Sequence, residues 1–173
     1  MNGAPLVLVS IASIALGRAL CGNRGSRAIE KRQRDFLERR QRELFDQAPE
    51  QRALHKKLLS FGGEMVVPIF EEDLKSILER GELLNTKDYA VAFVSGATSQ
   101  CHANACNLWE QDPDVYQIYT GWALTADDGL WRQHSWVLDL WGGEIIETTE
   151  PRELYFGFGM THDEASRFVQ ENW

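Results

Sequence analysis

The feature that most constrains the fold is a succession of three strand-like segments in the second half of the chain. They read "VYQIYTGWAL" at 115–124, "LWRQHSWVLDLW" at 130–141 and "GEIIETT" at 143–149, and are rich in β-branched and aromatic residues. The connections "TADDG" and "GG" are short and consist of turn-forming residues. Consecutive strands joined by short turns pair with one another, so these segments predict an antiparallel sheet.

Helical patterns surround this sheet. A long charged helix with a narrow apolar stripe is expected over 27–47, and a second helix over 50–63, ended by Gly62 and Gly63. Residues 64–70 are strand-like, 71–84 form an amphipathic pattern, and 88–97 predict a buried strand that runs into a turn of small residues. The stretch "THDE" at 161–164 is a capping box that opens a closing helix to about residue 170. Helices followed by a sequential antiparallel sheet predict an α+β domain.

Charge divides the chain unevenly. Residues 1–60 hold 12 Lys/Arg and 6 Asp/Glu, whereas residues 61–173 hold 6 and 20, so the two parts carry +6 and −14. An acidic main domain repels a phosphate backbone, so nucleic acid is not expected as its ligand. With 173 residues, of which 43% are hydrophobic, the chain is long enough for one core with a modest appendage.

The first residues predict a separate segment. Residues 3–17 are uncharged, but they are fewer than the roughly 20 that a spanning helix needs. We interpret them as a membrane anchor or an uncleaved signal, with a buried helix or an overextended start as the alternatives. The basic residues that follow would keep the rest of the chain on the cytoplasmic side. We therefore divide the chain into an apolar segment at 1–22, a charged helical segment at 23–62 and a catalytic domain at 63–173, and expect a cytoplasmic protein that residues 3–20 could tether.

The stretch "SQCHANACNLW" at 99–109 puts Cys101 at the expected start of a helix. The positive end of a helix dipole stabilises thiolate over thiol and so favours a nucleophile. Catalysis also needs a base within hydrogen-bond reach and a group that orients the base. The candidate base is His134, which precedes Trp136 on a predicted strand. Cys21, Cys101 and Cys106 are too few for a disulfide framework, which suits a reducing compartment, and Cys106 is expected in the core.

These residues resemble a known pattern. A Cys at a helix start, "HSW" on a strand and "IIETT" ending the neighbouring strand look like the papain-like and transglutaminase-like cysteine enzymes, over residues 90–150. The resemblance implies a nucleophile helix packed on an antiparallel sheet. It also implies that Cys101 is the nucleophile, that His134 is the general base and acid, and that Glu147 stands where relatives usually have Asp or Asn.

The third member of the triad depends on the hairpin register. The orienting residue should lie opposite Trp136, two residues beyond His134. If Gly142 and Gly143 form the turn, Trp136 faces Thr149; if the turn slips back by one residue, with Gly143 acting as a bulge, Trp136 faces Glu147. A carboxylate both orients an imidazole and stabilises an imidazolium, so Glu147 is the first candidate and Thr149 the alternative.

We expect the oxyanion of the reaction to be bound by the backbone N–H of Cys101 and by the side chain of Gln100, with Asn104 as a scaffold residue. The sequence therefore predicts a Cys-His hydrolase or acyltransferase that acts on an amide of a protein or peptide through a thioester. It could be a peptidase, a deamidase or a transglutaminase, and it needs no cofactor. Two alternatives stay open: an interaction module without catalysis, and, with poor ligand spacing, a zinc site built from Cys101, His102, Cys106 and His134.

Overall fold

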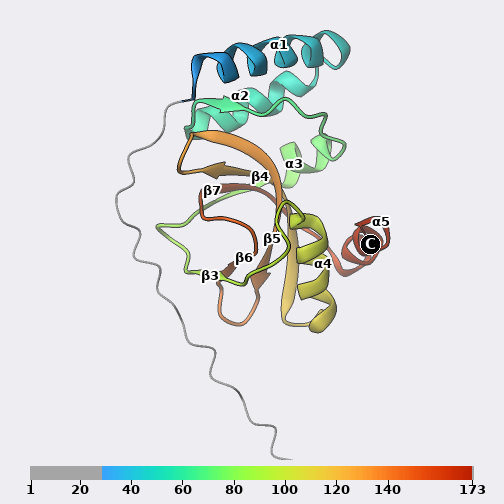
Figure 1. Cartoon of the computed structure of the whole chain (residues 1–173). Coiled ribbons are helices and arrows are strands. Elements are labelled where there is room, and N and C mark those ends of the chain that lie inside the picture. The colour runs from blue at the N-terminus through green and yellow to red at the C-terminus, as the bar shows by residue number, and fades with distance from the viewer. Residues whose placement is uncertain (1–28, 173) are drawn as a thin grey trace, which may run out of the picture.

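The centre of the molecule is a curled, seven-stranded sheet (Figure 1). The structure is a computed structural model that describes residues 29–172. The strands are β1 (Met65–Val66), β2 (Glu82–Asn85), β3 (Val91–Phe93), β4 (Tyr116–Thr125), β5 (Leu130–Asp139), β6 (Ile145–Glu147) and β7 (Arg152–Gly159). Their order is β2-β7-β4-β5-β6-β3, with β1 beside β5; only the β1–β5 and β3–β6 pairs are parallel. The predicted α+β class is confirmed.

Two glycines face each other on neighbouring strands of the sheet. Gly121 of β4 pairs with Gly157 of β7. A Cβ atom at Gly121 would lie 2.3 Å from the carbonyl oxygen of Phe156, and one at Gly157 would lie 2.8 Å from the Trp136 ring. Without side chains at these points the two backbones approach closely, which lets the sheet bend around the Trp136 indole.

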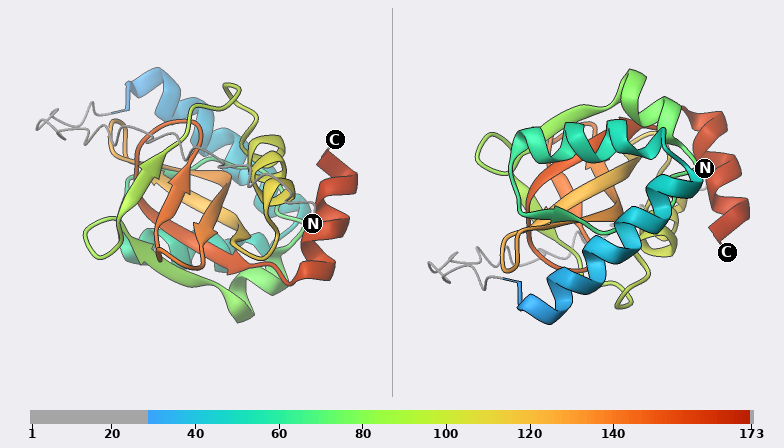
Figure 2. Two further views of the ribbon diagram at one scale, coloured as in Figure 1. Left: turned by 90° about the horizontal axis from the view of Figure 1, so that it is seen from below. Right: turned by 90° about the horizontal axis from the view of Figure 1, so that it is seen from above.

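Five helices accompany the sheet within residues 29–172: α1 (Lys31–Gln47), α2 (Gln51–Phe61), α3 (Leu74–Arg80), α4 (Cys101–Gln111) and α5 (His162–Asn172). Figure 2 shows α1 and α2 crossing one side of the sheet, with α4 and α5 lying beside it. Leu54 and Leu58 of α2 and Ala165 of α5 share one core with Trp122 and Val137 of the sheet. One core therefore spans the predicted boundary between residues 62 and 63.

The other face of the sheet is covered by its own curl rather than by a helix. Its core consists of Leu84, Tyr119, Ala123, Trp136, Ile145 and Tyr155, all buried. His134 has the same parity along β5 as Trp136, so it projects from this face. This face therefore surrounds the predicted catalytic histidine with aromatic rings.

The structure differs from the sequence predictions in one helix and two strands. The helix predicted over 71–84 ends at Arg80, because Gly81 has an extended backbone and Glu82–Asn85 form β2. The strand predicted as buried over 88–97 is the short edge strand β3, with Phe93 56% exposed, because it has a neighbour only on the β6 side. We did not predict β7, which lies between β2 and β4.

The predictions at the two ends differ in outcome. The capping box is confirmed: Thr161 N–H donates to Glu164 Oε2 at 2.7 Å, and Glu164 N–H donates to Thr161 Oγ1 at 3.3 Å. The predicted apolar segment 1–22 lies outside the described residues. Within residues 29–172, no helix has the length and apolar character needed to cross a bilayer.

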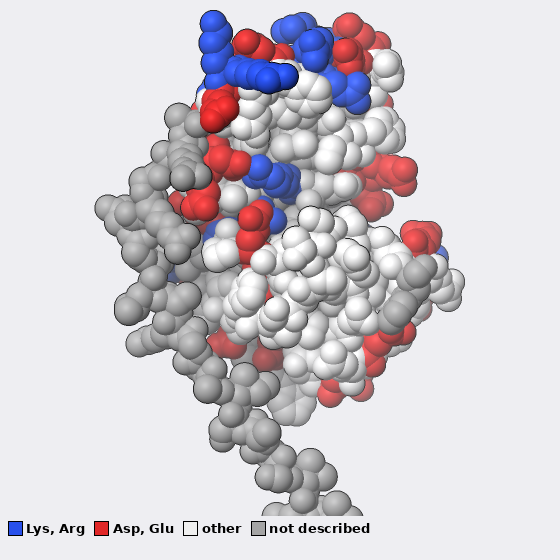
Figure 3. Space-filling view, viewed as in Figure 1, with Lys and Arg blue, Asp and Glu red and all other residues white. Residues whose placement is uncertain are grey.

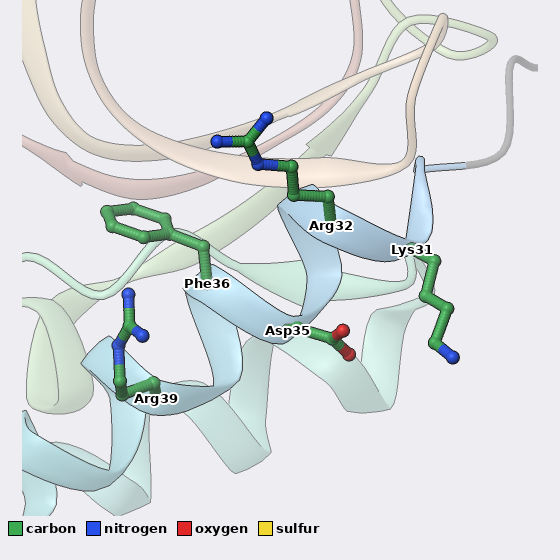
Figure 4. A pocket seen from close by; sticks show the side chains of 5 residues that line it. All are labelled: Lys31, Arg32, Asp35, Phe36 and Arg39. Atoms are coloured by element: carbon green, nitrogen blue, oxygen red, sulfur yellow. The ribbon is translucent and has the colours of Figure 1, made fainter.

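Basic side chains gather over α1 at the top of Figure 3, whereas acidic side chains dominate lower on the same face. A pocket of about 620 Å³ lies on α1, lined by Lys31, Arg32, Asp35, Phe36 and Arg39 (Figure 4). In Figure 4, Arg32 and Phe36 point to one side of the helix and Lys31 and Asp35 to the other. All five residues are exposed and include no nucleophile or histidine, so we place the candidate site elsewhere.

Candidate active site

The candidate nucleophile, Cys101, is the first residue of α4. Asn104, one turn later, holds the preceding turn in place: Ala97 N–H donates to its Oδ1 at 3.0 Å, and its Nδ2 donates to the Ala97 carbonyl at 2.9 Å. Ser99, within this turn, has a left-handed backbone with φ of 60°. Asn104 is therefore a scaffold residue that fixes where the helix begins, as the sequence predicts.

The edge of β5 next to Cys101 is open. β1 pairs with β5 at Leu130 and Trp131, and β6 pairs with it at Val137 and Leu138. Between these pairings, within the part of the chain that the structure describes, residues 132–135 have no strand on that side. The start of α4 lies at this gap, where the Ser135 N–H, free of a strand partner, helps to lower the pKa of the Cys101 thiol.

Cys101 lies beside the His134 ring, and each of the two groups shifts the pKa of the other. Burial raises the pKa of the Cys101 thiol, but the hydrogen bond and charge of His134 and the N–H groups of Ser135 and His102 outweigh it. The pKa is therefore lower than that of an ordinary thiol. A half-buried thiol with a lowered pKa beside an imidazole is the arrangement that nucleophilic catalysis requires.

His134 connects the thiol to a carboxylate. Its Nε2 lies 2.9 Å from Glu147 Oε2, which leaves Nδ1 for Cys101. The ring is 1% exposed and stacks between Trp136 and Tyr155, with ring centroids 6.3 Å and 6.2 Å away. Burial lowers the pKa of His134, but its bonds to Cys101 and Glu147 and their negative charges outweigh burial and raise it. The two shifts thus move Cys101 toward the thiolate and His134 toward the imidazolium.

Glu147 is fully buried and accepts hydrogen bonds at both oxygens. Oε2 accepts from His134 and from the Tyr155 hydroxyl, each at 2.9 Å. Oε1 accepts from the backbone N–H groups of Thr148 and Thr149 at 2.8 Å and from the Thr149 hydroxyl at 3.0 Å. Burial raises the pKa of Glu147, but His134 and these donors outweigh it and lower the pKa to about 2. The carboxylate is therefore ionised at neutral pH.

The hairpin has the second of the two predicted registers. Val137 faces Ile146 and Leu138 faces Ile145, so continuing the ladder sets Trp136 opposite Glu147. Asp139 explains why: its Oδ1 accepts the N–H groups of Trp141 and Gly142 at 2.8 and 3.0 Å, which closes a loop over 140–143. Thr149, the alternative third member, contacts Glu147 rather than taking its place.

A pocket of about 410 Å³ opens at this junction. It is lined by Val67, Ile69, Thr98, Ser99, Cys101, Arg132, Gln133, His134, Thr149, Glu150 and Arg152. Because the pocket lies at the edge of β5, it receives side chains from both faces of that strand. A substrate carbonyl in this pocket would meet Cys101 and His134 together.

Gln100, predicted to bind the oxyanion, is the exposed N-cap residue of α4 and is not among the residues that line the pocket. Gln133 lines it instead, and its Nε2 donates to Glu71 Oε2 at 3.2 Å. Glu71 is 3% exposed and also accepts from Trp122 Nε1 at 2.8 Å. The sequence reasoning missed Gln133 because it alternates with His134 and projects from the other face of β5.

The other cysteine and histidine of α4 have different surroundings. Cys106 is fully buried among apolar residues, as predicted, and burial, followed by the charge of Glu110, raises its pKa to about 11. His102 Nδ1 lies 2.7 Å from Ser135 Oγ, and burial together with the charge of His134 lowers the pKa of His102. Within residues 29–172, no group of three or more His, Cys, Asp or Glu side chains is arranged to hold a metal ion.

The chain matches no family model, no curated protein and no solved structure.

Proposed function

We propose that this chain is a cysteine hydrolase or acyltransferase that cleaves an amide through a thioester, with a papain-like or transglutaminase-like core. The observation that carries the proposal is the alignment of the Cys101 thiol, the His134 ring and the buried carboxylate of Glu147, with His134 Nε2 2.9 Å from Glu147 Oε2. The pKa of each residue is shifted in the direction that its role requires. It is lowered for the nucleophile Cys101, raised for the acid His134 and lowered for the orienting carboxylate of Glu147.

In the first half-reaction, the Cys101 thiolate attacks the carbonyl carbon of the amide, and the carbonyl π electrons move onto oxygen. The tetrahedral intermediate collapses by breaking its C–N bond, while the His134 imidazolium donates its proton to the leaving amine. The product is a thioester on Cys101 and a neutral His134. Glu147 keeps its charge throughout and stabilises the imidazolium whenever it is present.

In the second half-reaction, neutral His134 removes a proton from the acceptor as the acceptor attacks the thioester carbonyl. Water as the acceptor gives hydrolysis, and an amine gives acyl transfer. The thiolate leaves and the imidazolium forms again, so the site returns to its starting protonation state. No cofactor takes part in this chemistry.

The oxyanion that forms in both steps needs donors near the start of α4. The Cys101 N–H is one, because first-turn N–H groups have no acceptor inside the helix. The second donor in this proposal is Gln133 Nε2, which has one N–H directed to Glu71 and another left for the pocket. Glu71 would orient the Gln133 amide so that nitrogen rather than oxygen is presented.

The experiment that tests the function is profiling with covalent amide-mimicking probes, followed by mapping of the modified residue. The expected result is a single thioester or thioether on Cys101, lost in Cys101→Ala and retained in Cys106→Ala. A protein that folds normally but never reacts at Cys101 would instead be an interaction module. The probes that react best would also identify the amide class.

A further inference from the structure

Two guanidinium groups line the pocket that contains Cys101. Arg132 projects from β5 and Arg152 begins β7. Both Nη1 atoms donate to the Thr125 hydroxyl, at 2.8 Å and 2.6 Å, so the two guanidinium groups are held side by side. Two cations this close need negative partners, and the fold supplies Asp128 and Glu150.

The two arginines differ in how fully they are bonded. Arg132 binds both oxygens of Asp128, at 3.0 Å and 2.6 Å. Arg152 binds Glu150 at 2.8 Å through Nη1, the atom that also donates to Thr125. The Arg152 side chain is only 6% exposed, and its Nε, also buried, has no partner among the described residues. A guanidinium has five donors, so Arg152 is a buried cation with unused donors at the pocket wall.

Of the two carboxylates, Glu150, which binds Arg152, is easier to displace than Asp128, which binds Arg132. The Glu150 side chain is 52% exposed, and a single oxygen contacts Arg152. Because Glu150 reaches solvent, water and salt screen its side of the pair, and a displaced Glu150 carboxylate would be solvated. A substrate carboxylate that binds Arg152 in place of Glu150 would also use donors that are idle now.

We propose that the site acts on amide substrates that carry a carboxylate close to the amide, and that Arg152, supported by the charge of Arg132, binds this carboxylate in place of Glu150. The inference rests on the proposed function, because it assumes that Cys101 is the nucleophile. It adds the substrate class: acidic amides, bearing either a side-chain or an α-carboxylate.

The test compares two alkylating reagents of nearly equal size, anionic iodoacetate and neutral iodoacetamide, by their rates of reaction at Cys101. The ratio of the two rates measures how far the pocket favours a carboxylate. In Arg152→Met we expect this ratio to fall about five-fold or more while the iodoacetamide rate stays within about two-fold, and in Glu150→Gln we expect the ratio to rise. Arg80→Met is the matched control, since Arg80 pairs with Glu164 outside the pocket, and should leave the ratio unchanged.

Glu150→Gln removes no buried group, so it tests the inference even where Arg152→Met folds poorly. An unchanged ratio in Glu150→Gln, with Cys101 still reacting rapidly, would overturn the inference and leave the proposed function standing. Failure of Cys101 to react with either reagent would overturn both.

Protection experiments distinguish the two carboxylate sources. N-acetylglutamate α-amide and N-acetylglutamine are isomers, the first with a side-chain carboxylate and the second with an α-carboxylate. One of them should slow the labelling of Cys101 by iodoacetamide more than the neutral N-acetylglutamine amide does, and Arg152→Met should remove the difference. Equal weak protection by all three compounds would contradict the inference.

Discussion

Cys101 and Cys106 lie on the same helix, five residues apart, yet their surroundings drive their thiol pKa values in opposite directions. Burial raises the pKa of both. At Cys106, where the surroundings are apolar and Glu110 adds its charge, burial prevails; at Cys101, His134 and two backbone N–H groups more than offset it. The comparison teaches that a reactive cysteine is defined by what faces it rather than by its helix or its burial.

The largest expected effect is the difference in turnover between variants of the two cysteines. Cys101→Ala should lower the hydrolysis of any amide substrate by a factor on the order of 10³ or more, because the covalent step is lost. Cys106→Ala should leave kcat within a few-fold and lower the free energy of unfolding by about 1 kcal/mol, since it removes one buried sulfur. The measurements are steady-state kinetics and urea unfolding. A comparable loss of kcat in both variants would contradict the comparison.

Glu147→Gln should reduce kcat by about 10²-fold or more, because the imidazolium loses its counter-charge. It should also change the response to acid. The carboxylate stabilises the fold above its unfolded pKa of about 4.5, and this contribution, of the order of 3 kcal/mol, is lost as pH falls toward about 2. Urea unfolding between pH 2 and pH 6 should therefore show a flatter pH dependence in Glu147→Gln.

A matched control exists for this acid response. The pKa of Glu164 is also lowered to about 2, chiefly by its bond to Arg80, but Glu164 lies in the capping box of α5. Glu164→Gln should leave the reactivity of Cys101 unchanged. If Glu147→Gln also left Cys101 reactivity and kcat unchanged, Glu147 would be a structural carboxylate only.

A smaller effect is expected at Gln133. Gln133→Ala should lower kcat about 10- to 100-fold through loss of one oxyanion donor, while the rate of alkylation at Cys101 stays nearly constant, because alkylation forms no oxyanion. Comparing the two rates in one variant separates a role in the transition state from general damage to the site. Equal losses in both would point to damage.

The smallest effect concerns the turn that sets the register. Asp139→Ala removes the acceptor for two N–H groups of the 140–143 loop and should cost about 1 kcal/mol of stability. If the loop loosens, the Glu147–His134 contact should weaken, and the thiol pKa of Cys101 should rise slightly. Thermal unfolding and the pH profile of alkylation measure the two effects. Glu144→Ala, in the same loop region, is the control.

The sequence predicts some parts of the site and not others, for physical reasons. Cys101 and His134 follow from local rules: a polar turn before a helix and the alternation of a strand. The register could not be chosen, because it depends on whether Asp139 caps its own loop, and two turns fit the same residues. Tyr155 was missed with β7, where Gly157 and Gly159 interrupt the apolar pattern. Gln133 was missed because alternation along β5 places it on the face opposite His134. The pocket lies at the open edge of β5, so it receives side chains from both faces.

The most direct test of the central claim is the pH–rate profile of iodoacetamide modification at each cysteine, resolved by peptide mapping. We expect Cys101 to react with a midpoint below the ordinary thiol pKa of about 8.5, Cys106 to stay unreactive there, and His134→Gln to move the Cys101 midpoint upward. A Cys101 midpoint at or above 8.5 that His134→Gln does not change would contradict the claim.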